Sequence, residues 1–392
     1  MTRILAKTWL KAEFVLLAKR RAQPVFNVNR VANPQGKRRA LFVYLTLPFH
    51  LRSNHPTFQH HQNRKQAVQI AQLLGESGYV VDVVDITDRA FRPAGVYDLV
   101  LSHRVDYAGL EPAISERTVK IYLASGTNHI WRNRTIRQRL DALASRRGRQ
   151  LDPVAWDIED MPWVRNADAT VCFGNERVVQ SWREVCPGPV HGFNNYGIIM
   201  NNKFSRDYTD ARRHFLFFGS RQQVGKGLDL LLEVFPRHPE LHLYICSRYE
   251  KEKDFCACYH RELFETPNIH PCGWIDIGGR RFRELTARCA WVTLPSCSEG
   301  SPGSVTTAMS NGLVPILTRE AGIDLQDCGI LFADDHIETI DQTICEAAQL
   351  PAGAVEAMSQ RTYEAAKRNF SEEAFLQRWR KILSDIHQKF PC

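Results

Sequence analysis

The sequence lacks the features that would assign it to a membrane-spanning, fibrous or disordered class. No run approaches the ~18 uninterrupted apolar residues that a spanning helix needs, so we expect no transmembrane segment. Hydrophobic residues make up 44% of the 392 residues and charged residues 24%, which argues against long disorder, collagen-like repeats and coiled coil. A chain of this length predicts two or three domains, with two as the simplest interpretation.

The 11 cysteines form no disulfide framework and include no C-x2-C pair. Because a chain this long can build its core without disulfides, we expect a reducing, cytoplasmic compartment. The densest group of potential metal ligands is Cys256, Cys258, His260, His270 and Cys272. Zinc ligation is the alternative there, but the spacing favours buried or loop thiols, and we predict no metal site.

The excess positive charge is confined to the N-terminal extension. The formal net charge is +8, but residues 1–40 hold ten basic residues and the single acid Glu13, so the remainder carries −1. We therefore expect no nucleic-acid partner. Within residues 3–21, Leu10, Phe14 and Leu17 lie at helical spacing among Lys and Arg. This pattern indicates either a basic helix that holds the protein peripherally on an anionic membrane surface, or a packed or frayed arm.

Short β-rich runs alternate with helical patterns along the rest of the chain. The expected strands are residues 40–46, 79–84, 97–101, 119–123, 169–173, 215–218, 241–246, 290–294 and 313–317. Helical spacing is found over residues 67–74, 134–147, 228–235, 305–309 and 372–387. The alternation predicts an α/β fold of two doubly wound, Rossmann-like domains that face each other across a cleft.

The patterns divide the chain into five segments. They are a basic extension (1–39), an N-terminal domain (40–195), an Asn-rich linker (196–213), a C-terminal domain (214–371) and a terminal helix (372–392). Ligands of doubly wound sheets bind outside the carboxyl ends of the strands, so the cleft between the domains is the expected site.

Two segments of the C-terminal half suit an anionic ligand. Gly219 and Ser220 follow a strand, and the cations Arg221 and Lys226 stand before a helix, an arrangement that suits a diphosphate. The small-residue segment 295–304 leads into the helix at 305, which Ser304 is placed to cap. Glu299 lies at the mouth of this loop, where it either accepts hydrogen bonds from ligand hydroxyls or is a capping or solvated carboxylate.

Together these segments resemble the retaining GT-B glycosyltransferases of family 4, also called glycosyltransferase group 1. The resemblance is carried by the stretches FFGSRQQVGKGLDLLLEVF, NIHPCGWI and PSCSEGSPGSVTTAMSNGLVPILTREAG, and it covers residues 214–345 well. It implies transfer of a sugar, with retention, from a UDP- or GDP-linked donor to a hydroxyl of a glycan or lipid-linked acceptor in cell-surface polysaccharide or glycolipid synthesis. It implies no cofactor and no obligate metal, and the sequence has no Asp-x-Asp motif that would hold a divalent ion.

The resemblance also assigns roles to residues. It implies that Arg221 and Lys226 bind the donor diphosphate, that Glu299 contacts the donor sugar, and that Trp274 and Ile275 hold the base through backbone groups. The remaining donor-site residues expected from these loops are Gly219, Ser220, Gly300, Ser301, Pro302, Gly303, Ser304 and Thr307.

Thr307 is the main departure from the family pattern. A second glutamate, which grips the ribose hydroxyls, is expected there, and a threonine offers only a weaker neutral hydrogen bond. We expect an active variant, because the diphosphate cations and Glu299 are present. The alternative is a catalytically inactive nucleotide-sugar or glycan-binding protein of the same fold.

The N-terminal domain is expected to hold the acceptor. A histidine on a loop after a strand contacts the donor sugar in related enzymes, and His129 is the candidate here, with His103 as its rival. The expected catalytic set is therefore Glu299, Arg221, Lys226 and His129. The segment 47–63 is expected to be a loop that borders the cleft, or simply a mobile polar loop; its histidines are His50, His55, His60 and His61.

Overall fold

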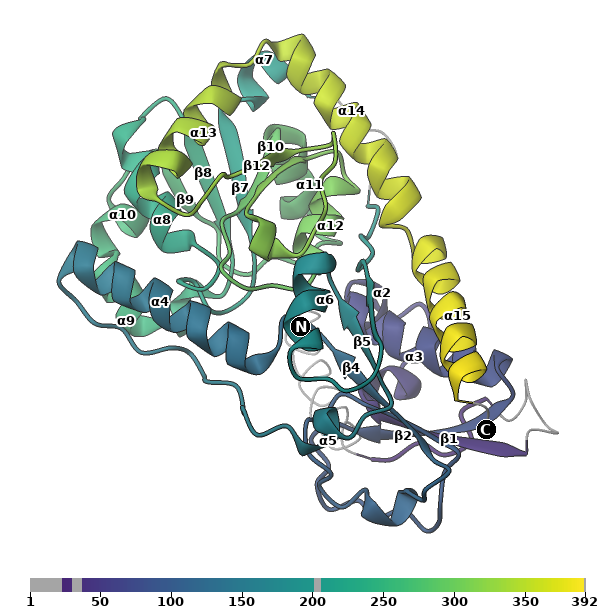
Figure 1. The fold of residues 1–392 in the computed structure, drawn as a ribbon. Coiled ribbons are helices and arrows are strands. Elements are labelled where there is room, and N and C mark those ends of the chain that lie inside the picture. The colour runs from purple at the N-terminus through teal and green to yellow at the C-terminus, as the bar shows by residue number, and fades with distance from the viewer. Residues whose placement is uncertain (1–22, 30–36, 201–205, 391–392) are drawn as a thin grey trace, which may run out of the picture.

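The computed structural model describes residues 23–29, 37–200 and 206–390. Within them the chain forms two six-stranded sheets, each flanked by helices (Figure 1). The predicted α/β class is confirmed. The helix expected within residues 3–21 lies outside the described residues.

The N-terminal sheet has the strand order β2-β1-β3-β4-β5-β6, and every neighbouring pair is parallel. Its strands are β1 (Arg38–Tyr44), β2 (Tyr79–Asp85), β3 (Leu99–Ser102), β4 (Val119–Ala124), β5 (Ala169–Phe173) and β6 (Val190–Phe193). Its helices are η1 (Leu47–His50), α2 (Pro56–Gln59), α3 (Gln62–Glu76), η2 (Glu111–Ala113), α4 (His129–Arg147), α5 (Pro162–Arg165) and α6 (Glu176–Arg183). Because helices cover both faces, its central strands are apolar throughout rather than alternating.

The C-terminal sheet has the order β12-β11-β10-β7-β8-β9, again all parallel. Its strands are β7 (His214–Phe218), β8 (His242–Cys246), β9 (Ile269–Pro271), β10 (Trp291–Leu294), β11 (Val314–Leu317) and β12 (Ile330–Leu331). The helices of this half are α7 (Tyr208–Ala211), α8 (Leu228–Val234), η3 (Phe235–Arg237), η4 (Tyr249–Lys251), α9 (Lys253–Cys258), α10 (His260–Phe264), α11 (Arg280–Arg288), α12 (Gly303–Met309), η5 (Arg319–Ala321), α13 (Ile337–Gln349) and α14 (Ala352–Asn369). Chain order reverses between β7 and β10, which is where doubly wound sheets bind ligands.

Two helices tie the halves together (Figure 1). Helix α4 comes from the N-terminal half, yet Leu140 and Leu143 are buried in the core cluster of the C-terminal sheet. The final helix α15 (Glu372–Lys389) follows the C-terminal half in the chain but packs beside α3, and its Phe375 and Trp379 are buried in the core of the N-terminal sheet. Each half therefore contributes a helix to the core of the other, which holds the two sheets in a fixed relative position.

Two helices of the N-terminal half begin earlier than the sequence predicted. Helix α4 begins at His129 rather than 134, because the Asn128 side chain caps it by accepting a hydrogen bond from the N–H of Trp131 (2.7 Å). His129 is therefore the first residue of a helix and not part of a loop. Helix α3 begins at Gln62 rather than 67, and the expected loop 47–63 contains η1 and α2. The first turn of α3 is polar, which hides its apolar period.

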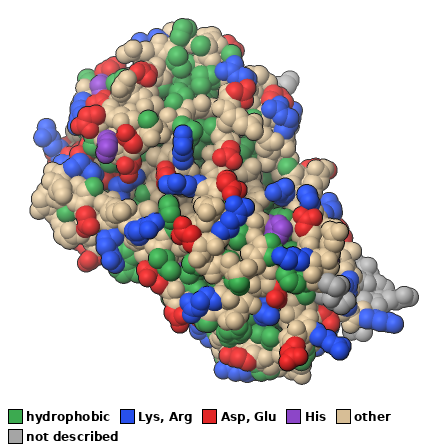
Figure 2. Space-filling model, in the orientation of Figure 1, with side chains coloured by type: hydrophobic (Ala, Val, Ile, Leu, Met, Phe, Trp, Pro, Cys, Tyr) green, Lys and Arg blue, Asp and Glu red, His purple; other side chains and the backbone are tan. Residues whose placement is uncertain are grey.

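The surface carries charges of both signs. Lys and Arg side chains are interspersed with Asp and Glu over the face drawn in Figure 2. Among the described residues, no helix is both long enough and apolar enough to cross a membrane.

Candidate active site

Loops at the carboxyl ends of the two sheets enclose a cavity of about 760 Å³. It lies at the β7/β10 reversal, and the loops after β1 and β4 close it from the other side. All predicted donor-site residues except Arg221 line it: Gly219, Ser220, Lys226, Trp274, Ile275, Glu299, Gly300, Ser301, Pro302, Gly303, Ser304 and Thr307. We call it the nucleotide-side cavity.

A second cavity of about 640 Å³ lies beside the first, mainly against the N-terminal half. Arg221, His129 and His103 line it, so Arg221 is the predicted donor-site residue that lines this cavity without lining the first. We call it the acceptor-side cavity. The two cavities share Ser125, Ser220, Lys226, Glu299 and Gly300.

An ion pair between Lys226 and Glu299 stands where the cavities meet. Both side chains are largely buried, 13% and 20% exposed. Lys226 is held by the turn after β7, which is tied to the loop after β10 because the Gly225 carbonyl accepts from the N–H of Cys297 (2.9 Å) and the hydroxyl of Ser296 (3.0 Å). The backbone of both loops therefore fixes the pair.

The loop that carries Glu299 rests directly on the N-terminal half. A Cβ on Gly300 would lie 2.5 Å from the Cα of Gly126 and 2.5 Å from the Phe173 carbonyl, so only glycine fits. Ser301 follows with a φ of +48°, and its hydroxyl accepts from the N–H of Asn195 (2.9 Å). These contacts hold the loop in one conformation across the cleft.

Helix α12 begins two residues earlier than expected, at Gly303, and Pro302 is its N-cap. The prediction that Ser304 caps this helix is therefore wrong, since Ser304 lies inside the first turn. Neither the N–H of Gly303 nor that of Ser304 has a hydrogen-bond acceptor among the described residues. Both line the nucleotide-side cavity and remain available as donors to an anion.

Arg248 is a second cation of the nucleotide-side cavity that the sequence reasoning missed. It follows β8, and its guanidinium lies over the ring of Trp274, 5.6 Å from the centroid. Trp274 is 60% exposed, so most of its ring faces the cavity and solvent. The signal in the sequence was the position of Arg248 at the carboxyl end of a predicted strand.

The hydroxyl of Thr307 is already engaged by protein. It accepts from the Gln62 side-chain amide (2.7 Å) and from the N–H of Ile198 (3.2 Å), and the residue is only 1% exposed. The same amide nitrogen of Gln62 donates to the Gly303 carbonyl (2.8 Å). Gln62, from the N-terminal half, thus occupies the space beside Thr307, a role that no sequence pattern indicated.

The two rival histidines differ in environment. His129 donates a hydrogen bond through Nδ1 to the Ile158 carbonyl (2.7 Å), and its Nε2 has no partner among the described residues. His103 stacks on Tyr122, and burial lowers its pKa, opposed by a hydrogen bond to the Leu123 carbonyl. His103 is therefore a ring packed in the core, whereas His129 lies at the surface of the cavity at the start of α4.

The histidines of segment 47–63 divide into two groups. His60 and His61 line the nucleotide-side cavity, whereas His50 and His55 line neither cavity. His60 Nδ1 lies 2.9 Å from a carboxylate oxygen of Asp276, a contact across the cleft. Desolvation, with the nearby cations Arg64 and Arg248, lowers the pKa of His61 to about 4.

The Cys/His group that the sequence offered as the zinc alternative does not assemble. The Cys256 thiol donates to the Tyr249 carbonyl, and His270 pairs with His242 (3.1 Å). In the part of the chain that the structure describes, the one cluster of three potential metal ligands is His238, Asp341 and Cys345, and these residues line neither cavity.

Comparison with known proteins supports the C-terminal assignment directly. Residues 212–349 match the family model described as glycosyl transferases group 1. No curated protein matches the sequence.

Solved structures resemble nearly the whole chain. A sucrose-phosphate synthase from Thermosynechococcus elongatus has 12% identity and a TM-score of 0.61, covering 90% of this chain and 100% of that one. HepE from Anabaena in complex with UDP and glucose has 13% identity and a TM-score of 0.55, covering 89% and 100%. WaaG, a glycosyltransferase involved in lipopolysaccharide biosynthesis, has 14% identity and a TM-score of 0.52, covering 88% and 98%. The chain therefore has the GT-B fold, two Rossmann-like domains facing each other across a cleft, and its residues 212–349 match the glycosyl transferases group 1 family.

Proposed function

We propose that the protein is a retaining glycosyltransferase that moves a sugar from a nucleotide-diphosphate sugar to an acceptor hydroxyl. One observation carries the proposal: the Lys226–Glu299 pair stands where two cavities of different lining meet. A donor in one cavity and an acceptor in the other would place the reacting atoms beside this pair.

Different residues of the nucleotide-side cavity suit the base and the diphosphate of the donor. Trp274 and Ile275 border the place of the base, and Lys226 and Arg248 supply positive charge for the diphosphate. In the transfer, the acceptor oxygen bonds to the anomeric carbon, the bond to the diphosphate oxygen breaks, and the electron pair leaves with the nucleotide. The proton of the acceptor hydroxyl passes to the departing diphosphate. Fixed cations and free N–H groups stabilise that charge best because they need no reorganisation. We propose that these groups suffice without a metal ion.

The solved structures that resemble this chain indicate which sugar donors to test first. HepE is described with UDP and with UDP-glucose, and WaaG as an enzyme of lipopolysaccharide biosynthesis. We propose a uridine-linked donor, with GDP-linked sugars as the alternative, and a cell-surface glycan or glycolipid acceptor. Cytoplasmic action on the inner face of a membrane, held by the basic residues 1–39, belongs to the same proposal. Liposome sedimentation of the full chain and of a form lacking residues 1–35 tests the last point.

Thermal unfolding with UDP, GDP and CDP, each with and without EDTA, tests the donor site. A ligand at 100 times its dissociation constant stabilises the folded state by about 2.7 kcal/mol. We expect a higher Tm with one nucleotide, unchanged by EDTA, and sugar transfer from the matching donor to an acceptor. No shift with any nucleotide would overturn the donor site, and a shift without transfer to any acceptor would favour the non-catalytic binding protein.

A further inference from the structure

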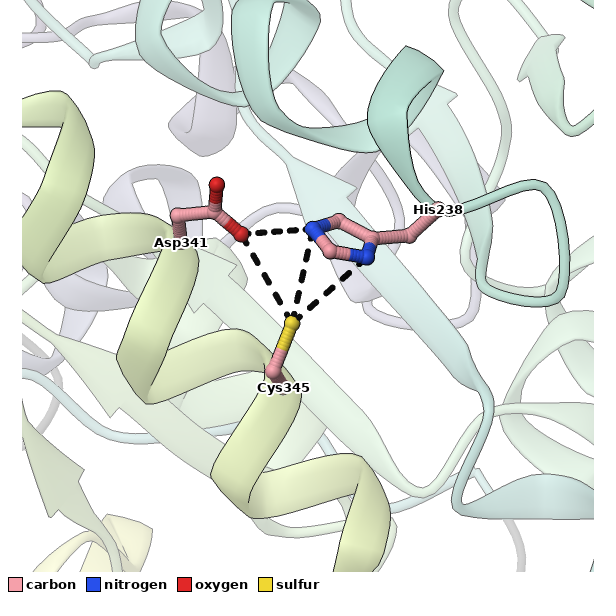
Figure 3. Close-up of side chains that lie close together, drawn as sticks. All are labelled: His238, Asp341 and Cys345. Carbon is pink, nitrogen blue, oxygen red and sulfur yellow. Dashed lines mark hydrogen bonds and ion pairs between the residues drawn. The ribbon is translucent and has the colours of Figure 1, made fainter.

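We propose that His238, Asp341 and Cys345 form a structural binding site for a divalent transition-metal ion of the zinc type. The site is remote from the cleft and does not depend on the proposed transfer activity. The three side chains come from two elements: His238 follows η3, and Asp341 and Cys345 lie one turn apart on α13 (Figure 3). An i, i+4 pair on one helix face is a standard way to present two ligands together.

The distances fit a tetrahedral ion. Ligand atoms bound to zinc at 2.0–2.3 Å lie about 3.3–3.8 Å from one another. The Cys345 sulfur lies 3.5 Å from His238 Nε2 and 3.6 Å from an Asp341 carboxylate oxygen. The distance from His238 Nε2 to the same oxygen is 2.6 Å and has to lengthen by about 0.7 Å when an ion binds. Two of the three distances between ligand atoms therefore already fit a bound ion.

Neighbouring charges orient two of the ligands. The second oxygen of Asp341 pairs with Arg237 (3.1 Å), so the first oxygen faces the other two ligands. His238 Nδ1 lies 3.9 Å from the Glu240 carboxylate, which favours a proton on Nδ1 and leaves Nε2 for an ion. His238 and Asp341 are 24% and 22% exposed, so an ion can enter from solvent and keep water as its fourth ligand.

The same three residue types could instead form a nucleophilic cysteine centre. A nucleophile needs a pocket in which a substrate lies against it, and the three residues line neither cavity. Their position therefore favours the metal site over the catalytic one.

The position indicates a structural role. His238 lies four residues before β8, whereas Arg248 of the nucleotide-side cavity follows the same strand at its other end. An ion would clamp α13 to the start of the sheet, beside α8, on which α13 packs. We expect bound metal to stabilise the C-terminal half without altering nucleotide binding.

Cobalt titration of the reduced, chelator-stripped full chain tests the site. We expect one Co²⁺ per chain, a near-ultraviolet thiolate-to-cobalt charge-transfer band, loss of the band when Zn²⁺ is added, and a Tm several degrees higher with Zn²⁺. Cys345→Ser should abolish the band, and Asp341→Asn and His238→Gln should weaken binding about tenfold or more. Cys258→Ser is the matched control, a half-buried thiol outside the cluster, and should keep the band.

Two results would overturn the proposal. One is the absence of a charge-transfer band in the unmodified chain. The other is a band that survives Cys345→Ser or disappears in Cys258→Ser. If Cys345→Ser fails to fold, as judged by circular dichroism, full-affinity binding in both Asp341→Asn and His238→Gln would overturn it equally.

Discussion

The ammonium of Lys226 pairs with the carboxylate of Glu299 where the two cavities meet. The pair joins the turn after β7 to the loop after β10, across the reversal of strand order. In a donor bound there, the leaving diphosphate would lie against the Lys226 ammonium. The sugar would face an acceptor hydroxyl in the acceptor-side cavity. Loss of either side chain should therefore impair the proposed transfer.

Replacing Lys226 by alanine should lower kcat/KM for sugar transfer by about 10²–10³-fold. The loss is on the scale measured when one group that stabilises transition-state charge is removed. The measurement is steady-state transfer from the donor that raises Tm. Lys251→Ala removes an exposed lysine that lines neither cavity, and it should leave the rate unchanged. Wild-type turnover in Lys226→Ala would rule out this role for the pair.

Arg221→Ala and Arg248→Ala should affect different substrates. Arg221 lines the acceptor-side cavity and forms no ion pair with any described residue, so its loss should raise KM for the acceptor. Arg248 lines the nucleotide-side cavity, so its loss should raise Kd for the nucleotide diphosphate. Each loss should be about 10–10²-fold, since a charged hydrogen bond contributes about 1.5–3 kcal/mol. Nucleotide calorimetry and acceptor kinetics separate the two effects. Weaker nucleotide binding in Arg221→Ala, with an unchanged KM for the acceptor, would instead support the sequence-based prediction that Arg221 binds the diphosphate.

Thr307→Glu should weaken nucleotide binding, and adding Gln62→Ala should restore it. A glutamate at 307 has to enter space that the Gln62 amide occupies, 2.7 Å from the threonine hydroxyl. Residues in direct contact show coupling energies of about 0.5–3 kcal/mol in a double-mutant cycle. Calorimetric titration of the wild type, both single variants and the double variant measures it. Tighter binding in Thr307→Glu alone would mean that Gln62 does not hold that space.

The thiol of Cys272 should react with alkylating reagents at neutral pH. A hydrogen bond from the Cys246 thiol, with the Arg281 guanidinium 3.6 Å from the sulfur, lowers the pKa of Cys272 to about 6 from an ordinary value near 9. The thiolate is the reactive form, so the rate should rise as pH increases through about 6 and then level off. Peptide mapping after iodoacetamide treatment follows it, and Arg281→Gln should move the midpoint upward. A midpoint near 9 in the unmodified chain would contradict the assignment.

Patterns along single elements predicted most of the fold. Continuous apolar runs gave the long central strands, and the spacing of Phe375 and Trp379 gave helix α15. The short edge strands β6, β9 and β12 were missed or only partly recognised, because two to four residues at an edge carry little period. The start of α4 was placed too late, and the Asn128 cap is the feature of the sequence that marks it.

The candidate site was predictable where it lies on consecutive residues and not where it depends on contacts between halves. The segment 299–304 was found because small residues and a glutamate stand together before a helix. Gln62 was not found, because its role arises from contact with Thr307 and Gly303, about 240 residues away. The cavity that Arg221 lines was not predictable either, because adjacency in sequence does not reveal which side of a loop a side chain faces.

Two tryptophans should separate stability from binding. Trp379 on α15 is fully buried against Phe193, with ring centroids 5.4 Å apart, so Trp379→Ala should cost about 3–5 kcal/mol of folding free energy. Trp274 is 60% exposed at the nucleotide-side cavity, so Trp274→Ala should change stability by no more than about 0.5 kcal/mol and weaken nucleotide binding. Urea unfolding and nucleotide titration of both variants measure the two effects. Because α15 supplies core residues to the sheet formed by the start of the chain, the loss in Trp379→Ala should fall on the N-terminal half. An unfolding midpoint that drops in Trp274→Ala and stays constant in Trp379→Ala would reverse the assignment of both residues.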